Sequence, residues 1–197
     1  MEIVDASVQL YVEKYTSPED PLLKEISDFT NQHHSRSIML SGHLQGKMLE
    51  MVSCMIRPHR ILEIGTFTGY SAICLAKGLD KKGFLHTIEL REDDGSTAKS
   101  YFDRSFFKDQ IILHIGDALD IIDEIKETWD LVFIDADKEN YINYFNLVFP
   151  KVRTNGFILA DNVLFHGQVL EKEIKGKNAI AIQAFNDYLW GRNDVEV

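Results

Sequence analysis

Hydrophobic and polar residues follow two different patterns along the chain, and the change falls near residue 58. Before it, apolar residues recur at the three- and four-residue spacing of amphipathic helices. This spacing predicts helices over residues 3–15, 17–34 and 42–56, the last ending ahead of Pro58. In the second helix, Ser17 suits the cap and Pro18 the first turn. The first 57 residues are therefore predicted to be a helical lead-in.

From residue 60 onward, short apolar runs alternate with amphipathic segments. The apolar runs are typical of buried strands and span residues 60–65, 83–90, 110–116, 129–135 and 156–162. The helices predicted between and after them span residues 69–79, 93–107, 118–126, 138–152 and 176–190. This alternation predicts an α/β fold with a doubly wound, mostly parallel sheet. We expect one domain over residues 1–197, with residues 58–197 as its α/β core.

The carboxyl ends of the strands are where such sheets bind ligands, so the residues there are the first candidates for chemistry. The first strand carries Glu63 and runs into a turn with Gly65 and Gly69 that opens a helix. Glycines in such a turn let a ligand approach the backbone closely. The turn has neither the G-x-G-x-x-G spacing of dinucleotide binders nor the G-K-[ST] of a P-loop.

Acidic residues also end the next two strands. Glu89 lies 20 residues after Gly69, where an acid commonly hydrogen-bonds ribose hydroxyls, and Asp117 follows the third strand, where an adenine amine can be read. Three acids in one crevice, with no basic residue for a pyrophosphate, favour a nucleoside that carries an amine and a sulfonium. S-adenosylmethionine fits this description. The alternative is that each acid caps a helix at the surface.

Oxygen ligands end the last two strands. Asp135 closes the fourth strand, and Asp161 with Asn162 closes the fifth. Because these strands are neighbours in a doubly wound sheet, the three side chains can converge on one point. Carboxylate and amide oxygens suit a hard cation, Mg2+ first and Mn2+ or Ca2+ as alternatives. The alternative is that Asp135 and Asp161 cap the segments that follow them.

Composition and charge exclude several classes of protein. The net charge is −10, and the one modest basic cluster spans residues 57–60, so the chain lacks the basic stripe of a typical nucleic-acid binder. No apolar run approaches the ~20 residues of a membrane span, and the N-terminus carries no secretion signal. Cys54 and Cys74 lie among apolar residues and are expected to be buried, reduced thiols in a cytoplasmic protein.

Four stretches of the sequence closely resemble the cation-dependent O-methyltransferases, which include catechol and caffeoyl-CoA O-methyltransferases. They are "LEIGTFTGYSAICLA", "IGDAL", "FIDADKENYINY" and "LADNVLFHGQV". The similarity runs from residue 38 to the end of the chain, and "FIDADK" followed by "DN" is its most specific signal.

The resemblance implies a Rossmann-like methyltransferase core whose N-terminal helices cap the substrate. Metal ligation would fall to Asp135, Asp161 and Asn162, and catalysis to Asp135 and to Lys138 as general base. Tyr141 is equally consistent with packing. The residues implied to bind S-adenosylmethionine are Met39, Glu63, Gly65, Thr66, Gly69, Tyr70, Ser71, Glu89, Asp117, Ala118 and Asp135.

The implied reaction is in-line methyl transfer to a hydroxyl of a small catechol-like phenol, which needs no protein nucleophile. A metal holding two vicinal oxygens would lower the pKa of the attacking hydroxyl. The alternatives are methylation of a hydroxyuridine in tRNA, by analogy within the family, and a non-catalytic nucleoside-binding protein. A nucleotide-dependent oxidoreductase is disfavoured by the missing pyrophosphate fingerprint.

Two further expectations concern assembly. The family commonly forms homodimers, so we expect one here. Its members normally continue beyond the position of Val197 into a final antiparallel strand. The resemblance therefore implies that this strand is missing and that one edge of the sheet is open.

Overall fold

Five parallel strands form the sheet at the centre of the computed structural model, which describes residues 5–197. In sheet order they are β3 (Ile111–Ile115), β2 (Phe84–Glu89), β1 (Arg60–Ile64), β4 (Trp129–Ile134) and β5 (Val152–Ala160). Every neighbouring pair is parallel. The predicted doubly wound sheet is therefore confirmed, and residues 5–197 add no antiparallel strand to it.

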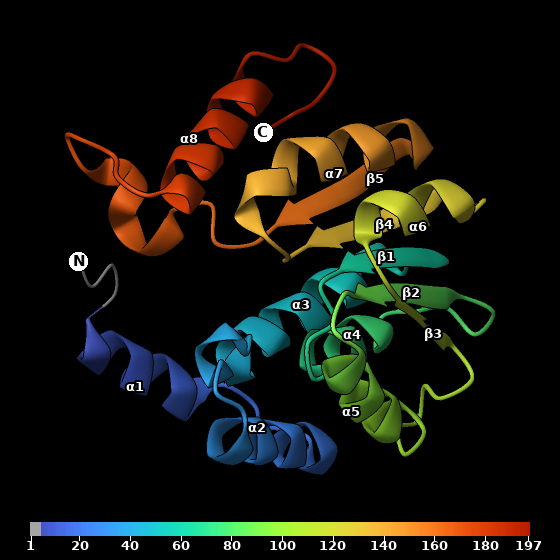
Figure 1. Ribbon diagram of the computed structural model, residues 1–197. Coiled ribbons are helices and arrows are strands. Elements are labelled where there is room, and N and C mark those ends of the chain that lie inside the picture. The colour runs from blue at the N-terminus through green and yellow to red at the C-terminus, as the bar shows by residue number, and fades with distance from the viewer. Residues whose placement is uncertain (1–4) are drawn as a thin grey trace.

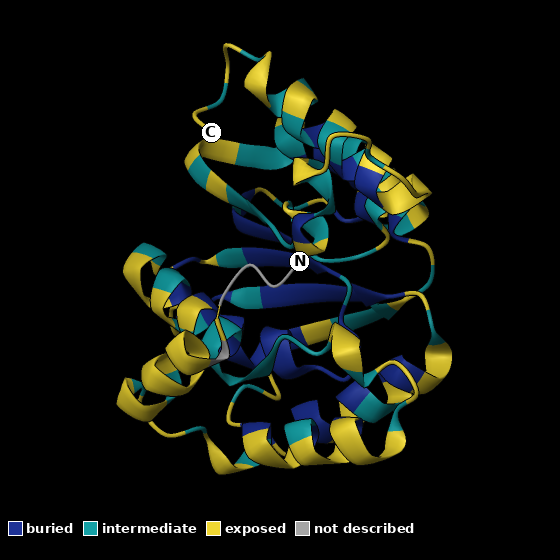
Figure 2. Ribbon diagram, turned by 90° about the vertical axis from the view of Figure 1, so that its left-hand side faces the viewer, coloured by how far each residue is buried: buried dark blue, intermediate teal, exposed yellow. Residues whose placement is uncertain are grey.

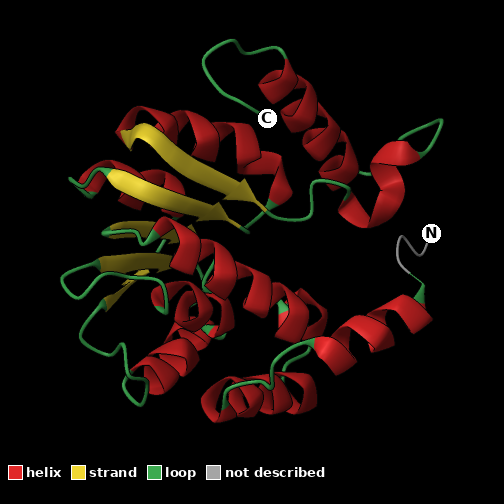
Figure 3. Ribbon diagram, turned by 180° about the vertical axis from the view of Figure 1, so that it is seen from behind, coloured by secondary structure: helices red, strands yellow, loops and turns green. Residues whose placement is uncertain are grey.

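Helices cover both faces of this sheet (Figure 1). One face packs against α2 (Pro21–His33), α3 (Gly42–Ile56), α4 (Tyr70–Ala76) and α5 (Glu92–Phe102). The other packs against α6 (Ala118–Glu124), α7 (Tyr141–Val148) and α8 (Lys177–Trp190). The outermost helix on the first side is α1 (Ala6–Tyr15), which contacts α3. Figure 3 shows the same layers from behind.

Short 3-10 helices connect several of these elements. They are η1 (Ser37–Met39), η2 (Lys138–Asn140), η3 (Phe149–Lys151) and η4 (Phe165–Leu170). Three of them, η1, η2 and η4, contribute residues to the cavity described below.

Two hydrophobic clusters, one on each face of the sheet, form the core. The first joins Ile26 of α2 and Leu49 of α3 to the strands, and the second joins Trp129 of β4 to Phe185 of α8. The central strands are therefore covered on both sides, as Figure 2 shows in dark blue. Burial on both faces explains why β1 and β4 read as continuous apolar runs.

The second helix begins later than predicted. Asp20 is its cap and accepts the N–H of Leu22 at 2.9 Å, while Pro21 occupies the first turn. The pairs Ser17–Pro18 and Asp20–Pro21 carry the same start signal, and the structure uses the second. The predicted first helix begins at Ala6, behind a cap at Asp5, and its residues 3–4 lie outside the described residues.

The last predicted helix–strand boundary was also wrong. Pro150 ends the regular helix, so the segment predicted as helix 138–152 divides into η2, α7 and η3. Strand β5 starts four residues earlier than predicted, because the polar stretch 153–156 is part of it. Asn155 has a φ of 60°, and the pairing of β4 with β5 is irregular there. A bulged edge strand breaks the apolar alternation on which the prediction rested.

The outer faces of α1 and α3 leave many apolar side chains exposed. Cys54 belongs to this surface, which corrects the prediction that both thiols are buried; Cys74 on α4 is buried. Cys54 is exposed because it lies on the turn of α3 that faces away from the sheet, next to Met55. We call this surface the α1–α3 face; its exposed large apolar residues are Val8, Leu10, Tyr11, Val12, Tyr15, Met48, Met51 and Met55. Within residues 5–197, no helix has the length and apolarity needed to span a membrane.

Candidate active site

A cavity of about 930 Å³ opens at the carboxyl ends of the strands. Its wall comes from the turns after all five strands, from η1 and from the start of α3. Glu63 and Gly69 are the two predicted site residues that do not reach this wall. The predicted residues that do are Met39, Gly65, Thr66, Tyr70, Ser71, Glu89, Asp117, Ala118, Asp135, Lys138, Asp161 and Asn162.

Within residues 5–57 of the predicted N-terminal cap, only the segment 36–45 contributes to the cavity wall. They include Met39 in η1, whose side chain is about half exposed, and Gln45 in the first turns of α3. Helices α1 and α2 support this segment from outside and do not line the cavity.

The glycine turn after β1 brings the backbone against the neighbouring strand. Gly65 has a φ of +102°, and a Cβ atom there would lie 2.0 Å from the carbonyl oxygen of Asp135. Gly69 also has a positive φ, but its missing Cβ makes room for the ring of Phe102 on α5. The first glycine therefore shapes the cavity floor, while the second serves the packing of α4 on α5. Tyr70 next to it donates its hydroxyl to Glu19.

Glu63 is a fully buried acid behind the glycine turn. One carboxylate oxygen accepts the hydroxyl of Thr87, and the other, Oε1, has no hydrogen-bond partner among residues 5–197. Burial raises the pKa of Glu63 to about 8, and the negative charges of Asp135 and Glu89 add to this effect. The hydroxyls of Ser71 and Thr87 act in the opposite direction. A buried carboxyl with a free oxygen beside Ser71, which lines the cavity, is suited to receive a cationic group.

Glu89 ends β2 and holds the glycine turn in shape. Its carboxylate accepts the backbone N–H of Phe67 at 2.7 Å and that of Arg91 at 3.0 Å. Phe67 has a φ of 50°, a strained value for an aromatic residue, so this hydrogen bond stabilises an unusual backbone conformation. Asp117 lines the cavity and also caps α6 by accepting the N–H of Leu119 at 2.8 Å. Asp117 is therefore a helix cap, as the alternative interpretation of the sequence expects, and it also lines the cavity.

The ends of β4 and β5 bring two carboxylates together, as the topology predicts. The N–H of Asp135 donates to Ile64 O and that of Asp161 to Ile134 O, both at 2.9 Å, so the sheet ladder continues to these residues. The pKa of Asp161 is raised to about 6, first by burial and then by the charge of Asp135, while Lys138 opposes both effects. Asn162 follows with a φ of 61°, which asparagine tolerates better than most residues.

Lys138 lies over these two strand ends. Its Nζ donates to Asp135 Oδ1 at 3.1 Å and also to the hydroxyl of Tyr141. The side chain of Lys138 is only 11% exposed, so the ammonium group is held between a carboxylate and a phenol in a restricted space. Tyr141 is fully buried, and its hydroxyl lies 3.0 Å from the carbonyl oxygen of Asp161.

Sequence reasoning missed two residues that hold this region. From the sequence Tyr141 is equally consistent with packing, although its spacing three positions after Lys138 at the start of a helix is a usable signal. Gln45 donates to Asp161 Oδ1 at 2.8 Å from 116 positions away, and nothing in the local sequence indicates that contact. His166 also lines the cavity.

The donor atoms at the ends of β4 and β5 match a hard divalent cation in type. Among residues 5–197, no group of three or more His, Cys, Asp or Glu side chains is placed to hold a metal ion. The set here is instead two carboxylates and one amide, Asp135, Asp161 and Asn162, which share one part of the cavity wall. An acid such as Asp161, whose ionisation is opposed by burial and by a neighbouring carboxylate, is one that a divalent ion would stabilise.

A family model, curated sequences and solved structures all relate this chain to O-methyltransferases. A family model described as O-methyltransferase matches residues 13–197. The chain is 31% identical over 194 residues to a catechol O-methyltransferase of Niastella koreensis, covering 96% of this chain and 87% of the relative. It is 31% identical over 172 residues to a caffeoyl-CoA O-methyltransferase of Eucalyptus gunnii, covering 84% and 69%.

Two solved structures show the same fold. The O-methyltransferase TomG from Streptomyces achromogenes, in complex with SAM, superimposes with a TM-score of 0.88 at 30% identity, covering 95% of this chain and 86% of that one. The SAH-bound methyltransferase PaMTH1 of Podospora anserina gives a TM-score of 0.90 at 25% identity, covering 97% and 88%.

Proposed function

This chain belongs to the O-methyltransferase family, and from that premise we propose that it transfers a methyl group from S-adenosylmethionine to one hydroxyl of a small catechol-like phenol with the help of a divalent cation. The observation that carries the proposal is one cavity whose wall brings together Glu89 and Asp117, the paired strand-end carboxylates and Lys138.

S-adenosylmethionine supplies an electrophilic methyl group on a sulfonium. Several groups in the cavity wall and directly behind it match the parts of this molecule. Glu63 offers a buried carboxyl with a free oxygen for the amine of the methionine moiety, and Glu89 ends β2 where a ribose would be bound. Gly65 opens the floor, and Met39 covers it from η1. Complexes of relatives with SAM and SAH support this assignment.

The divalent cation would be held by Asp135, Asp161 and Asn162, and Mg2+ is our first choice, ahead of Mn2+ and Ca2+. When bound, it supplies Lewis acidity toward two adjacent oxygens of the acceptor. The task of the protein side chains is then to remove the proton from the attacking hydroxyl. Lys138 Nζ, which Asp135 and Tyr141 orient, would take the proton from the attacking hydroxyl in its neutral amine form. No protein nucleophile is required, and positioning accounts for the remaining acceleration.

A catechol-like acceptor is the substrate class that this arrangement favours, because vicinal oxygens match a site with one cation and one base. The names of the relatives, catechol and caffeoyl-CoA O-methyltransferases, support the same class. A tRNA acceptor is the weaker alternative, since the chain has a net charge of −10 and no basic stripe.

The experiment is methyl transfer from labelled S-adenosylmethionine to a panel of catechols, with Mg2+ and with chelator. We expect activity that requires the metal and disappears in Asp161→Ala, while Asp109→Ala, at an exposed position outside the cavity, retains it. Cofactor binding without transfer to any catechol would refute the small-phenol acceptor. Equal activity with chelator would refute the metal.

We further propose that the protein is a cytoplasmic homodimer that associates through the α1–α3 face. The free thiols of Cys54 and Cys74 support a reducing compartment. Met48, Met51 and Met55 recur at helical spacing on α3 and are all more than half exposed, which is unusual for a monomer. Light scattering of the wild type and of Met51→Lys tests this: a dimer that the charge dissociates supports it, and a wild-type monomer refutes it.

A further inference from the structure

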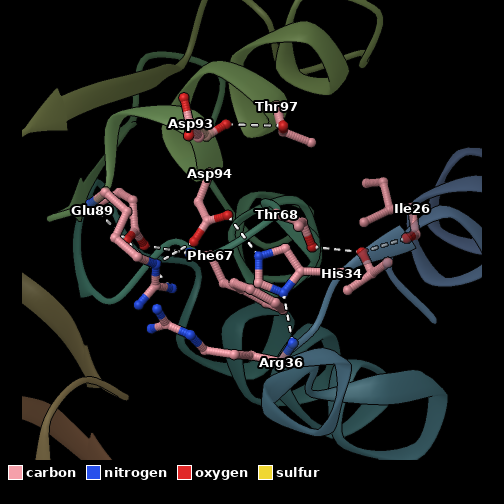
Figure 4. Close-up of polar contacts among 11 residues, drawn as sticks. Ile26, His34, Arg36, Phe67, Thr68, Glu89, Asp93, Asp94 and Thr97 are labelled. Carbon is pink, nitrogen blue, oxygen red and sulfur yellow. Dashed lines mark hydrogen bonds and ion pairs between the residues drawn. The ribbon is translucent and has the colours of Figure 1, made fainter. Parts of the chain in front are cut away.

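The turn that Glu89 stabilises is also tied to the N-terminal cap segment by a closed ring of contacts. Figure 4 shows His34 with one ring nitrogen toward Asp94 and the other toward the backbone of Arg36. Asp94 in turn accepts from Arg91, and Arg91 lies 3.6 Å from Glu89. Glu89 holds the N–H of Phe67, whose ring contacts the ring of His34 edge-on at 4.6 Å between centroids.

The two hydrogen bonds of His34 define the state of its ring. The backbone N–H of Arg36 donates to Nδ1 at 3.0 Å, so that nitrogen must be the unprotonated acceptor. Nε2 therefore carries the proton and donates to Asp94 Oδ1 at 2.9 Å. The imidazole of His34 therefore holds the backbone at the start of η1, which carries Met39 over the cavity. It also holds one carboxylate oxygen of Asp94.

Asp94 and Glu89 share the guanidinium group of Arg91 within this closed set of contacts. Asp94 is 5% exposed and Glu89 is 4% exposed, so both charges are shielded from water. Arg91 donates Nε to Asp94 Oδ2 and keeps Nη2 near Glu89 Oε1. His34 satisfies the remaining oxygen of Asp94. Without that donor, Asp94 would draw both guanidinium nitrogens into a two-pronged pair, because a fork is the favoured geometry between arginine and a carboxylate.

We propose that His34 is a positioning residue for the nucleoside of S-adenosylmethionine: by donating Nε2–H to Asp94 it keeps Arg91 beside Glu89 and so holds Glu89 and the Phe67 turn in their binding positions. His34 lies outside the cavity wall and acts only through these partners. The inference rests on the proposed function, since it concerns the binding of the same cofactor.

Two substitutions separate the two hydrogen bonds of His34. Asparagine places its Oδ1 where Nδ1 lies and can still accept the N–H of Arg36, but it is too short to reach Asp94. Glutamine places its amide where Nε2 lies and can still donate to Asp94. His33→Gln is the matched control, because His33 is exposed and its ring contacts Phe29, through the carbonyl oxygen and by stacking on the phenyl ring, and takes no part in the contacts of His34.

The measurements are the Kd for S-adenosylmethionine by calorimetry, kcat and KM with a catechol acceptor, and thermal unfolding. We expect His34→Asn to raise both the Kd and the KM for S-adenosylmethionine about three- to tenfold, the range for loss of one hydrogen bond, with kcat unchanged at saturation. His34→Gln is expected to stay within about twofold of the wild type, as is His33→Gln.

Equal Kd values for wild type and His34→Asn would overturn the inference while leaving the proposed function intact. Equal loss in both His34 variants, together with a lower melting temperature and a lower kcat, would also overturn it, because that pattern indicates a structural role only. A wild-type protein that binds no S-adenosylmethionine would overturn both the proposed function and the inference.

Discussion

Replacing Glu63 by glutamine should stabilise the protein while weakening cofactor binding. Glu63 is fully buried, and its pKa is raised from an ordinary value of 4.5 to about 8. In the unfolded chain this side chain ionises above pH 4.5, whereas in the native protein it keeps its proton until about pH 8. The native state therefore binds more protons across that window, and its stability must fall as the pH rises through it.

The size of the effect follows from the same values. Ionisation of the unfolded chain is worth ~1.4 kcal/mol for each pH unit above its pKa. At pH 7, below the native pKa of about 8, the cost to folding reaches about 3 kcal/mol as an upper bound. Glutamine has nearly the same shape and no proton to lose in either state. Its oxygen can still accept the hydroxyl of Thr87, and its amide occupies the place of the free Oε1.

Urea unfolding of wild type and Glu63→Gln at pH 5, 6, 7 and 8 tests this reasoning. We expect the variant to gain about 1–3 kcal/mol over the wild type between pH 5 and pH 8. Glu124→Gln is the control, because Glu124 is exposed near the end of α6. Identical pH dependence of wild type and Glu63→Gln would refute the assignment of a buried, protonated carboxyl.

Cofactor binding adds a second readout for the same residue. A cationic amine beside Glu63 favours the carboxylate, so binding at pH 7 should release about one proton from the wild type. Calorimetry in buffers with different ionisation enthalpies measures that release. Glu63→Gln should release none and bind S-adenosylmethionine about tenfold more weakly, the loss expected when a charged partner is removed.

Three further predictions concern other parts of the structure. Gly65→Ala should abolish cofactor binding and lower the free energy of unfolding in urea by ~2–3 kcal/mol, because the added Cβ meets the backbone of Asp135. Gly176→Ala is the control: its φ is similar but the space around it is open, so it should cost only ~1 kcal/mol. Tyr141→Phe should lower kcat about tenfold with KM unchanged in steady-state assays, because Lys138 loses its second partner; an unchanged kcat would contradict this. Burial lowers the pKa of His86 to about 4, so its contribution to stability should shrink as the pH falls, and His86→Gln should gain about 1–2 kcal/mol over the wild type in urea between pH 7 and pH 5.

The sequence was most informative where one strong local signal decided the structure. Helix α3 was predicted with its observed ends because Pro58 forces a stop. Strands β1 and β4 were found because burial on both faces leaves an unbroken apolar run. The start of α2 was wrong because two cap-and-proline pairs stand three residues apart, and sequence alone offers no reason to choose between them.

The strand-end residues of the candidate site were predictable from the topology of the sheet. Parallel strands end at one edge, so Glu89, Asp135 and Asp161 could be placed together without coordinates. The groups that hold them could not. Gln45 reaches Asp161 across 116 positions, and His34 reaches Asp94 across 60. Such contacts depend on how helices dock on the sheet, which no local pattern encodes.

The central position of β1 has a consequence for how the protein folds. Its neighbour β2 follows closely in the chain, but Ile61 pairs on the other side with Leu131, seventy positions further along. Closing so long a loop costs entropy before any contact compensates for it, so this pairing belongs to a late and slow step. On the ribosome, β1, β2 and β3 can assemble with α3 to α5 before β4 has emerged. The nascent chain then exposes the apolar edge and face that β4, α7 and α8 later cover. A chaperone that shields this half-formed sheet would protect the protein during the interval in which it is most prone to aggregate.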